Sequence, residues 1–450
     1  MKLMKYSLLA VLLTALAGFG FAQELEPKPN DPYFENFKPV KAPRPTGLVL
    51  RKGDRLAIAG DSITEQKMYS RIMETYLTVC VPELEITARQ YGWGGEVAPT
   101  FLRRMTNDCL RFKPTIATTC YGMNDHGYRA YEPAIGDRYR QSSTAIVQAF
   151  KANGARVIQG SPGCVSHKPE ALNLNLCTLR NIGIEIAESE KVGFADVFWP
   201  MVTAEFTAHQ KYATNYWIAG GDGVHPGWSG HLVMAYAFLK SFGLDGDIGT
   251  FTVDLKSGQA QASKGHKIVS ARDGEVRIES DRYPFCASDP LDKDSSVRSA
   301  MTLIPFNQEL NRLMLVAKNG SARSYKVTWG AETKEYAAEQ LAKGVNLAND
   351  FAVNPFSEAF KKVDAAVIAK QNYETKQIKQ IFHDLVNGKY KAADDIKDME
   401  LKELFTLRDA DGKFDRDAVA AATEKKRSAL AAAIKTAFVP VTHTLRIEAN

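Results

Sequence analysis

The chain has 450 residues, of which 45% are hydrophobic and 24% are charged. This composition is typical of a globular protein with room for two or three domains. The formal charge is +5, and two of the positive charges come from Lys2 and Lys5. So small an excess excludes a strongly basic nucleic-acid-binding surface, and no nucleic-acid partner is expected.

The N-terminus has the pattern of a secretory signal peptide. An apolar run from Tyr6 to Phe21 follows two lysines, and the small residue Ala22 precedes Gln23 at the predicted cleavage point. A membrane anchor is the alternative, but a spanning helix needs about 20 apolar residues, and this run is shorter. We therefore expect residues 1–22 to be removed, leaving no transmembrane anchor, and the protein to be exported to the periplasm or the extracellular space.

Residues 23–47 contain six prolines and predict a linker or an arm laid on the surface. Residues 48–246 then alternate short apolar runs with longer stretches of helical period. We expect strands at residues 56–59, 84–88, 115–119, 155–159 and 194–197. We expect helices at residues 65–79, 97–111, 136–152, 170–190, 200–211 and 227–241. This alternation predicts an α/β domain with a parallel sheet covered by helices on both faces.

The pattern changes after residue 246. Short alternating runs predict a small antiparallel β domain at 247–345, and Asp273-Gly274 and Asn319-Gly320 are typical of hairpin turns between paired strands. Residues 346–450 predict a helical region with a final strand at 439–447. The apolar residues along these helices indicate a packed core rather than a lipid-binding face.

Four short segments carry the candidate chemistry, and three of them follow predicted strands. They are Gly60-Asp61-Ser62-Ile63, Gly94-Gly95, Gly122-Met123-Asn124-Asp125 and Asp222-Gly223-Val224-His225. Ligands bind at the carboxyl ends of the strands in open parallel sheets, so these segments should meet at one edge.

Together the segments supply the parts of a serine hydrolase site. Ser62 is the candidate nucleophile, His225 the base and Asp222 the carboxylate that orients it. The backbone of Ser62, the backbone of Gly95 and the side chain of Asn124 are candidate oxyanion donors, with Gly94 left open as an alternative to Gly95. An isolated serine here would favour a helix N-cap, and an isolated Gly-Gly a tight turn. Asp61 and Asp125 are expected to hold loops by hydrogen bonds.

These motifs resemble the SGNH, or GDSL-type, hydrolase superfamily over roughly residues 50–245. The resemblance matches Ser62, Gly95, Asn124 and His225 to the four residues that name the superfamily. It implies a flavodoxin-like parallel sheet sandwiched by helices and a serine ester hydrolase that works through an acyl-enzyme intermediate. The second segment departs from the pattern, since Arg89-Gln90-Tyr91 stands where an asparagine is frequent. Its placement is therefore open by one residue.

The ester itself is less defined by the sequence. Trp93, Trp217 and Trp228 lie within a few residues of the candidate loops, and aromatic faces suit sugar rings. We expect a short-acyl, acetyl-type ester on a carbohydrate, either a small molecule or a polysaccharide. A lipase or lysophospholipase is the alternative, and a glycan-binding or scaffold protein with a vestigial site is a further one.

No cofactor and no metal are expected. The six cysteines form no Cys/His cluster, and Asp409-Ala410-Asp411-Gly412 has its glycine in the wrong place for a calcium loop. Export permits disulfides, and Cys164 with Cys177 is the pair that we expect to be bridged. Cys120 is expected to be a buried free thiol.

Overall fold

The computed structural model describes residues 23–450, so the predicted signal peptide lies outside the described residues. The first sheet has five parallel strands in the order β2-β1-β3-β4-β5. These strands are β1 (Arg55–Gly60), β2 (Thr87–Gln90), β3 (Ile116–Cys120), β4 (Arg156–Gly160) and β5 (Gly193–Ala195). This is the order of flavodoxin-like sheets, and the predicted α/β fold is confirmed.

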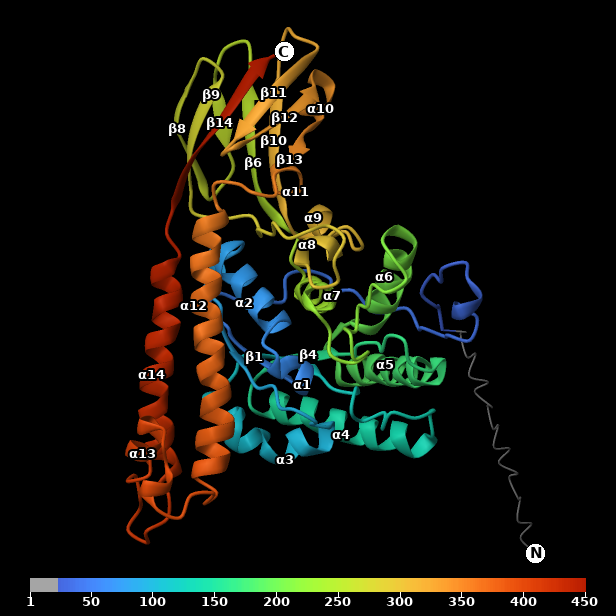
Figure 1. Cartoon of the computed structure of the whole chain (residues 1–450), viewed down its shortest axis with the longest axis vertical. Helices are drawn as coiled ribbons and strands as arrows, with labels where there is room; N and C mark the ends of the chain where they lie inside the picture. The colour runs from blue at the N-terminus through green and yellow to red at the C-terminus, as the bar shows by residue number, and fades with distance from the viewer. Residues whose placement is uncertain (1–22) are drawn as a thin grey trace, which may run out of the picture.

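Helices cover both faces of this sheet (Figure 1). Successive residues of a strand point to opposite faces, so Ala57 and Ala59 join the core under α3, α4 and α5, while Leu56 and Ile58 join the core under α2 and α7. The helices of this domain are α1 (Ser62–Glu65), α2 (Tyr69–Val79), α3 (Ala98–Asp108), α4 (Pro133–Ala152), α5 (Glu170–Glu190), α6 (Phe198–Lys211) and α7 (Trp228–Ser241). Two short 3-10 turns, η2 (Pro82–Leu84) and η3 (Leu110–Phe112), complete it. The strand expected at 84–88 begins later because η2 and Glu85, with φ of +50°, precede it.

Residues 23–47 form an arm that packs on the domain. Phe34, in the 3-10 turn η1 (Pro32–Phe34), and Phe37 are both buried, and their rings lie 5.7 and 6.1 Å from that of Trp199. The Arg180 guanidinium donates to the Val40 carbonyl at 2.7 Å. The segment is therefore part of the folded unit.

Two further sheets lie beyond the α/β domain at the top of Figure 1, with strand orders β13-β10-β6-β7 and β12-β11-β14-β9-β8. Their strands are β6 (Asp247–Asp254), β7 (Ala260–Ala262), β8 (His266–Arg272), β9 (Glu275–Ser280), β10 (Arg312–Lys318), β11 (Ser324–Trp329), β12 (Glu332–Ala337), β13 (Val345–Asn346) and β14 (Val441–Ala449). Pairing is antiparallel throughout except between β6 and β10, which run parallel. Short helices α8 (Val297–Ala300), α9 (Phe306–Glu309), α10 (Ala338–Lys343) and α11 (Leu347–Asp350) connect them.

One of the two predicted hairpins is correct and the other is wrong. Asp273-Gly274 joins β8 to β9, which are paired. Asn319-Gly320 joins β10 to β11, which belong to different sheets. The Asn319 amide donates to Asp254 at 2.6 Å and the Tyr325 hydroxyl accepts from the Ala322 N–H at 2.9 Å, so the segment is fixed as a crossing between sheets.

The C-terminal helices run along the side of the α/β domain (Figure 1). They are α12 (Ser357–Thr375), its π-helical continuation η4 (Lys376–Leu385), the 3-10 turn η5 (Ala393–Asp395), α13 (Met399–Leu404) and α14 (Arg416–Ala437). Gly388, with φ of +82°, lies just past the end of η4, a position where helices often end on a glycine. After α14 the chain returns to the β region, where β14 becomes the middle strand of its sheet.

The predicted Cys164–Cys177 disulfide is wrong. All six cysteines are free, and these two are buried in one apolar core. Burial raises the pKa of the Cys164 thiol and raises that of Cys177 to about 11, so both thiols stay protonated. Cys120 is buried and free, as expected.

Candidate active site

The candidate nucleophile, base and acid meet at the carboxyl edge of the first sheet. Ser62 follows β1, and His225 lies in the loop before α7. The Ser62 Oγ lies 2.9 Å from His225 Nε2, and His225 Nδ1 lies 2.7 Å from Asp222 Oδ2. This chain of hydrogen bonds lets Nε2 accept the serine proton while the carboxylate fixes the ring and its tautomer.

Asp222 is held in the geometry of a short loop. Its Oδ1 accepts from the backbone N–H groups of Val224 at 2.9 Å and His225 at 2.8 Å. Partial burial disfavours the charged form, but these bonds and the His225 ring outweigh it and lower the pKa of Asp222 to about 2. Asp222 is therefore ionised at neutral pH, and 57% of its side chain is exposed.

Asp61 and Asp125 shape the loops around Ser62, as the sequence predicts. Asp61 caps α1 by accepting from the Ile63 N–H at 3.0 Å. Asp125 accepts from the Ala98 and Gly122 N–H groups, both at 3.0 Å, and so ties the third segment to the start of α3. Burial is the main cause that raises the pKa of Asp61 to about 7 and that of Asp125 to about 6.

The backbone decides which glycine is free to donate to an oxyanion. The Gly94 N–H already donates to Glu65 Oε2 at 2.5 Å. Gly95 has φ of +72°, a conformation that favours glycine, and an added Cβ there would meet no atom within 4 Å. Gly95, rather than Gly94, is thus the candidate donor.

Two contacts orient the Asn124 amide. One Nδ2 hydrogen donates to the Glu96 carbonyl at 3.0 Å, and the Oδ1 accepts from the Tyr128 hydroxyl at 3.0 Å. Both fix the rotation of the amide and leave its second N–H for another acceptor. The role of Tyr128 was not expected, because nothing local in the sequence links a tyrosine to it.

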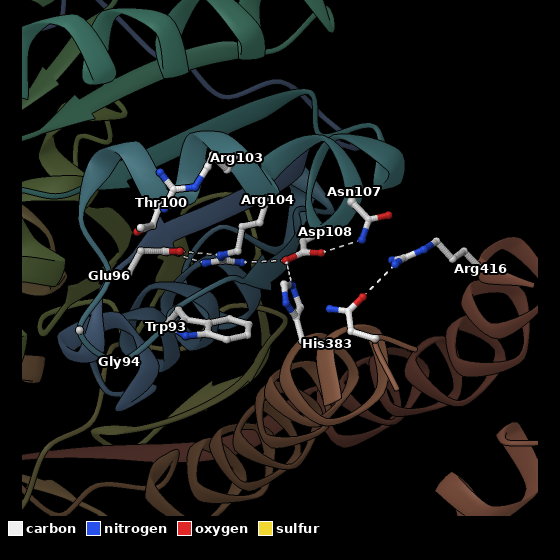
Figure 2. Close-up of a pocket in the computed structure, with 12 residues that line it drawn as sticks. Trp93, Gly94, Glu96, Thr100, Arg103, Arg104, Asn107, Asp108, His383 and Arg416 are labelled. Atoms are coloured by element: carbon white, nitrogen blue, oxygen red, sulfur yellow. Dashed lines mark hydrogen bonds and ion pairs between the residues drawn. The ribbon is translucent and has the colours of Figure 1, made fainter. Parts of the chain in front are cut away.

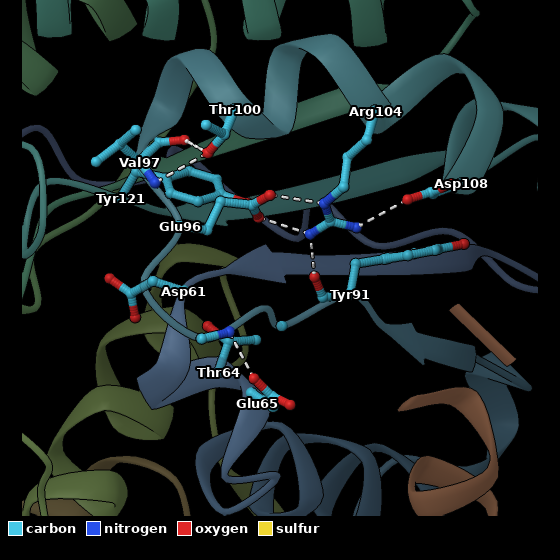
Figure 3. A network of polar contacts seen from close by, with 12 residues as sticks. Asp61, Thr64, Glu65, Tyr91, Glu96, Val97, Thr100, Arg104, Asp108 and Tyr121 are labelled. Atoms are coloured by element: carbon cyan, nitrogen blue, oxygen red, sulfur yellow. Dashed lines mark hydrogen bonds and ion pairs between the residues drawn. The ribbon is translucent and has the colours of Figure 1, made fainter. Parts of the chain in front are cut away.

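A buried ionic network supports the second segment (Figure 3). Arg104 donates to both oxygens of Glu96 at 2.6 Å, and its third nitrogen lies 3.4 Å from Asp108. Glu96 also accepts from the Tyr121 hydroxyl at 2.9 Å. Since Glu96 follows Gly95 directly, this network anchors the loop that carries the candidate oxyanion donor.

A cavity of about 670 Å³ opens beside this loop (Figure 2). One wall comes from Gly94, Gly95 and α3, and the other from η4 and the start of α14. Trp93 lines it, held by Arg104 and Lys379, each 5.0 Å from its ring, and by the His383 ring at 4.6 Å. The contribution of the C-terminal helices was not expected from the sequence.

The other two candidate tryptophans lie elsewhere. Trp217 packs between the rings of His167 and His209, at 4.8 and 5.2 Å. Trp228 begins α7 and lines a different cavity beneath Arg71, whose guanidinium is 5.5 Å from its ring. The three tryptophans therefore do not share one surface, and their roles in substrate binding stay predictions.

Within residues 23–450, no three His, Cys, Asp or Glu side chains are grouped as a metal site. In the same part of the chain, no helix combines the length and the apolar character that crossing a membrane requires.

Comparisons with known proteins agree with this geometry. Residues 58–233 match the sequence model of the GDSL-like Lipase/Acylhydrolase family. No curated protein matches the chain.

Among solved structures, the fold is similar to that of a gut microbial diltiazem-metabolizing enzyme, with a TM-score of 0.70, 21% identity, and coverage of 91% of this chain and all of the other. An acetylxylan esterase from Geobacillus stearothermophilus matches with a TM-score of 0.37 and 22% identity, over 44% of this chain and 97% of its own. A hydrolase from the metagenome of Lake Arreo, Spain, matches with a TM-score of 0.36 and 21% identity, over 44% of this chain and 98% of its own. Residues 58–233 thus form a GDSL-like lipase/acylhydrolase domain, which supports a serine ester hydrolase.

Proposed function

We propose that this acylhydrolase cleaves a short-acyl, acetyl-type ester of a carbohydrate through an acyl-enzyme on Ser62. The observation that carries the proposal is the pair of contacts that His225 makes, at 2.9 Å to Ser62 and 2.7 Å to Asp222. An imidazole held between a hydroxyl and an ionised carboxylate is the arrangement that serine nucleophiles require.

In the proposed first half-reaction, Ser62 Oγ attacks the ester carbonyl while its proton passes to His225 Nε2. The oxyanion that forms accepts from the N–H groups of Ser62 and Gly95 and from the free N–H of Asn124. The C–O bond to the alcohol then breaks, and His225 returns the proton to the leaving oxygen. Water attacks the acyl-Ser62 ester in the second half-reaction, with His225 again as base, and the carboxylic acid leaves.

The character of the neighbouring cavity favours a polar alcohol. Of its twelve lining residues, Trp93 alone has a large apolar side chain, and the rest are charged, polar or glycine. A long acyl chain packs along several apolar side chains, and this lining supplies one. The lipase alternative is accordingly the weaker one. Export remains part of the proposal, and it is supported by the pattern of residues 1–22.

The test uses Ser62→Ala and a serine-directed phosphonate. We expect the variant to fold, to lose nearly all hydrolysis of aryl acetate, and to escape labelling, whereas the wild type gains one adduct at Ser62 by peptide mass spectrometry. Acetate release should be measured on acetylated oligosaccharides beside aryl esters of increasing chain length. An active variant would remove Ser62 from the mechanism, and a preference for long chains would move the function to lipase.

A further inference from the structure

The cavity beside Gly95 has a distinctive balance of charge. Its acidic side chains are already paired: Glu96 holds Arg104, and Asp108 lies 3.4 Å from Arg104 and 2.7 Å from His383 Nε2. Within residues 23–450, each carboxylate that lines the cavity therefore already has a partner.

Two guanidinium groups that line the cavity have no acidic partner among residues 23–450. Arg103, on the exposed side of α3, makes no ion pair or hydrogen bond with any described residue. Arg416, at the start of α14, donates only to the neutral Asn387 Oδ1, at 2.9 Å, within the same part of the chain. Figure 2 shows the two arginines well apart on the cavity, Arg103 beside Thr100 on α3 and Arg416 on the wall that the C-terminal helices form.

This arrangement has the chemistry of an anion site. Guanidinium groups present planar sets of N–H donors that match the oxygens of carboxylates and sulfates, and like charges that face one cavity are relieved by a bound anion. The cavity volume of about 670 Å³ lies within the range of small-ligand sites, so it has room for sugar rings.

We propose that this cavity is a subsite for anionic groups, carboxylates or sulfates, on the sugar part of the substrate. The inference rests on the proposed function, since the oxyanion loop forms one wall and would place the scissile ester at the mouth of the subsite. Arg103 and Arg416 each bind an anionic group of the sugar chain at their own place on the rim, and the protein prefers esters of acidic glycans to those of neutral ones.

Binding of sugars that carry no ester tests the subsite without relying on catalysis. Calorimetry on the wild-type protein should compare three probes: a trimer of galacturonate, a sulfated trimer of xylose and neutral xylotriose. We expect at least one anionic probe to bind, weakening as salt is added, while xylotriose binds much less. The carboxylate and sulfate arms identify which anion the site takes.

Substitutions then assign the binding to these residues. Arg103→Gln and Arg416→Gln should each raise the dissociation constant for the anionic probe by about tenfold. Arg323→Gln, at an exposed position of the β region, is the matched control and should leave it unchanged. Equal binding of the neutral trimer, no binding of either anion, or binding that survives both substitutions would overturn the subsite. Absence of aryl acetate hydrolysis by the wild type would instead overturn the proposed function.

Discussion

Asp222 has its charge stabilised by the hydrogen bonds of one tight loop, although it lies at the surface. Burial is the largest single influence and opposes the charge, but the bonds from the His225 backbone, the His225 ring and the Val224 N–H together outweigh it and lower the pKa of Asp222 to about 2. The carboxylate is therefore ionised well below neutral pH. A loss of activity on the acid side of a pH–rate profile should then not come from protonation of Asp222 until the pH approaches 2.

Asp222→Asn tests this role. The amide keeps the shape and one acceptor, but it cannot stabilise an imidazolium, so we expect kcat to fall about 10²- to 10⁴-fold with little change in KM. Steady-state kinetics on aryl acetate measure the loss. Asp137→Asn, at an exposed position of α4, is the control. A variant that keeps half of the wild-type kcat would reduce Asp222 to a loop anchor.

Asp61 carries a cost to stability that depends on pH. Burial is the largest cause that raises its pKa from 3.8 to about 7. Below about pH 4 both folded and unfolded chains hold the proton, whereas between about pH 4 and 7 only the folded chain retains it. The contribution of Asp61 to the free energy of unfolding thus falls as pH rises through this window and is constant above it.

Asp61→Asn removes the titration while it keeps an oxygen to cap α1. We expect the variant to gain stability relative to the wild type as pH rises from 4.5 to 8, by at most about 4 kcal/mol, since each pKa unit corresponds to about 1.4 kcal/mol. Thermal unfolding of both proteins across this range measures the difference. A gap that stays constant or shrinks with rising pH would contradict the raised pKa.

At the scale of elements, η4 contacts the loop that carries the candidate oxyanion donor. Lys379 Nζ lies 2.6 Å from Glu65 Oε1, and the other oxygen of Glu65 accepts from the Gly94 N–H at 2.5 Å. The backbones of this loop and of α1 also pack closely at Gly92, where an added Cβ would lie 2.1 Å from the Glu65 nitrogen, so no larger residue fits there. The C-terminal helices therefore help to position Gly95 through Glu65.

Lys379→Met should loosen this contact without touching the substrate. We expect kcat to fall on the order of tenfold with KM nearly constant, less than the about 10²–10³ of losing an oxyanion donor outright. Lys379→Arg should restore most of the loss. Lys376→Met is the control, since Lys376 also lies in η4 but pairs with Asp398 and Glu400 at the start of α13, and it should leave kcat intact. An equal loss in both Met variants would indicate a general effect of η4 on folding.

The elements differ in how far the sequence could predict them. The first sheet, its helices and the meeting of Ser62, Asp222 and His225 follow from local patterns, because parallel strands bring their carboxyl ends to one edge. The Glu65–Lys379 contact spans 314 residues and has no local signal. The hairpin expected at Asn319-Gly320 failed for a similar reason: turn residues indicate a change of direction, whereas the pairing of β10 with β6 depends on the distant strand.

At the scale of the whole molecule, the C-terminal helices are joined to the α/β domain by buried charge. Lys370, 1% exposed, donates to the Ala88 carbonyl of β2 at 2.6 Å and lies 3.0 Å from Glu74 of α2 and 2.7 Å from Glu374. Burial raises the pKa of Glu74 against the effect of Lys370. Burial also opposes the charge of Glu374, but Lys370 and Arg427 outweigh it and lower its pKa. With β14 in the middle of the far sheet, the chain from α12 onward is integral to the fold.

Lys370→Met removes the cation that Glu74 and Glu374 share, and it leaves the negative charge of these carboxylates buried with one partner fewer. Breaking a buried pair in this way costs about 3–5 kcal/mol, so the denaturant midpoint should drop sharply at pH 8. The loss should be smaller at pH 5, because a carboxyl whose pKa is already raised by burial can then take up a proton and become neutral. Lys362→Met, exposed on the same helix, is the matched control and should shift the midpoint little. A loss that is equal at both pH values would show that lost packing, rather than unpaired charge, accounts for the effect of Lys370.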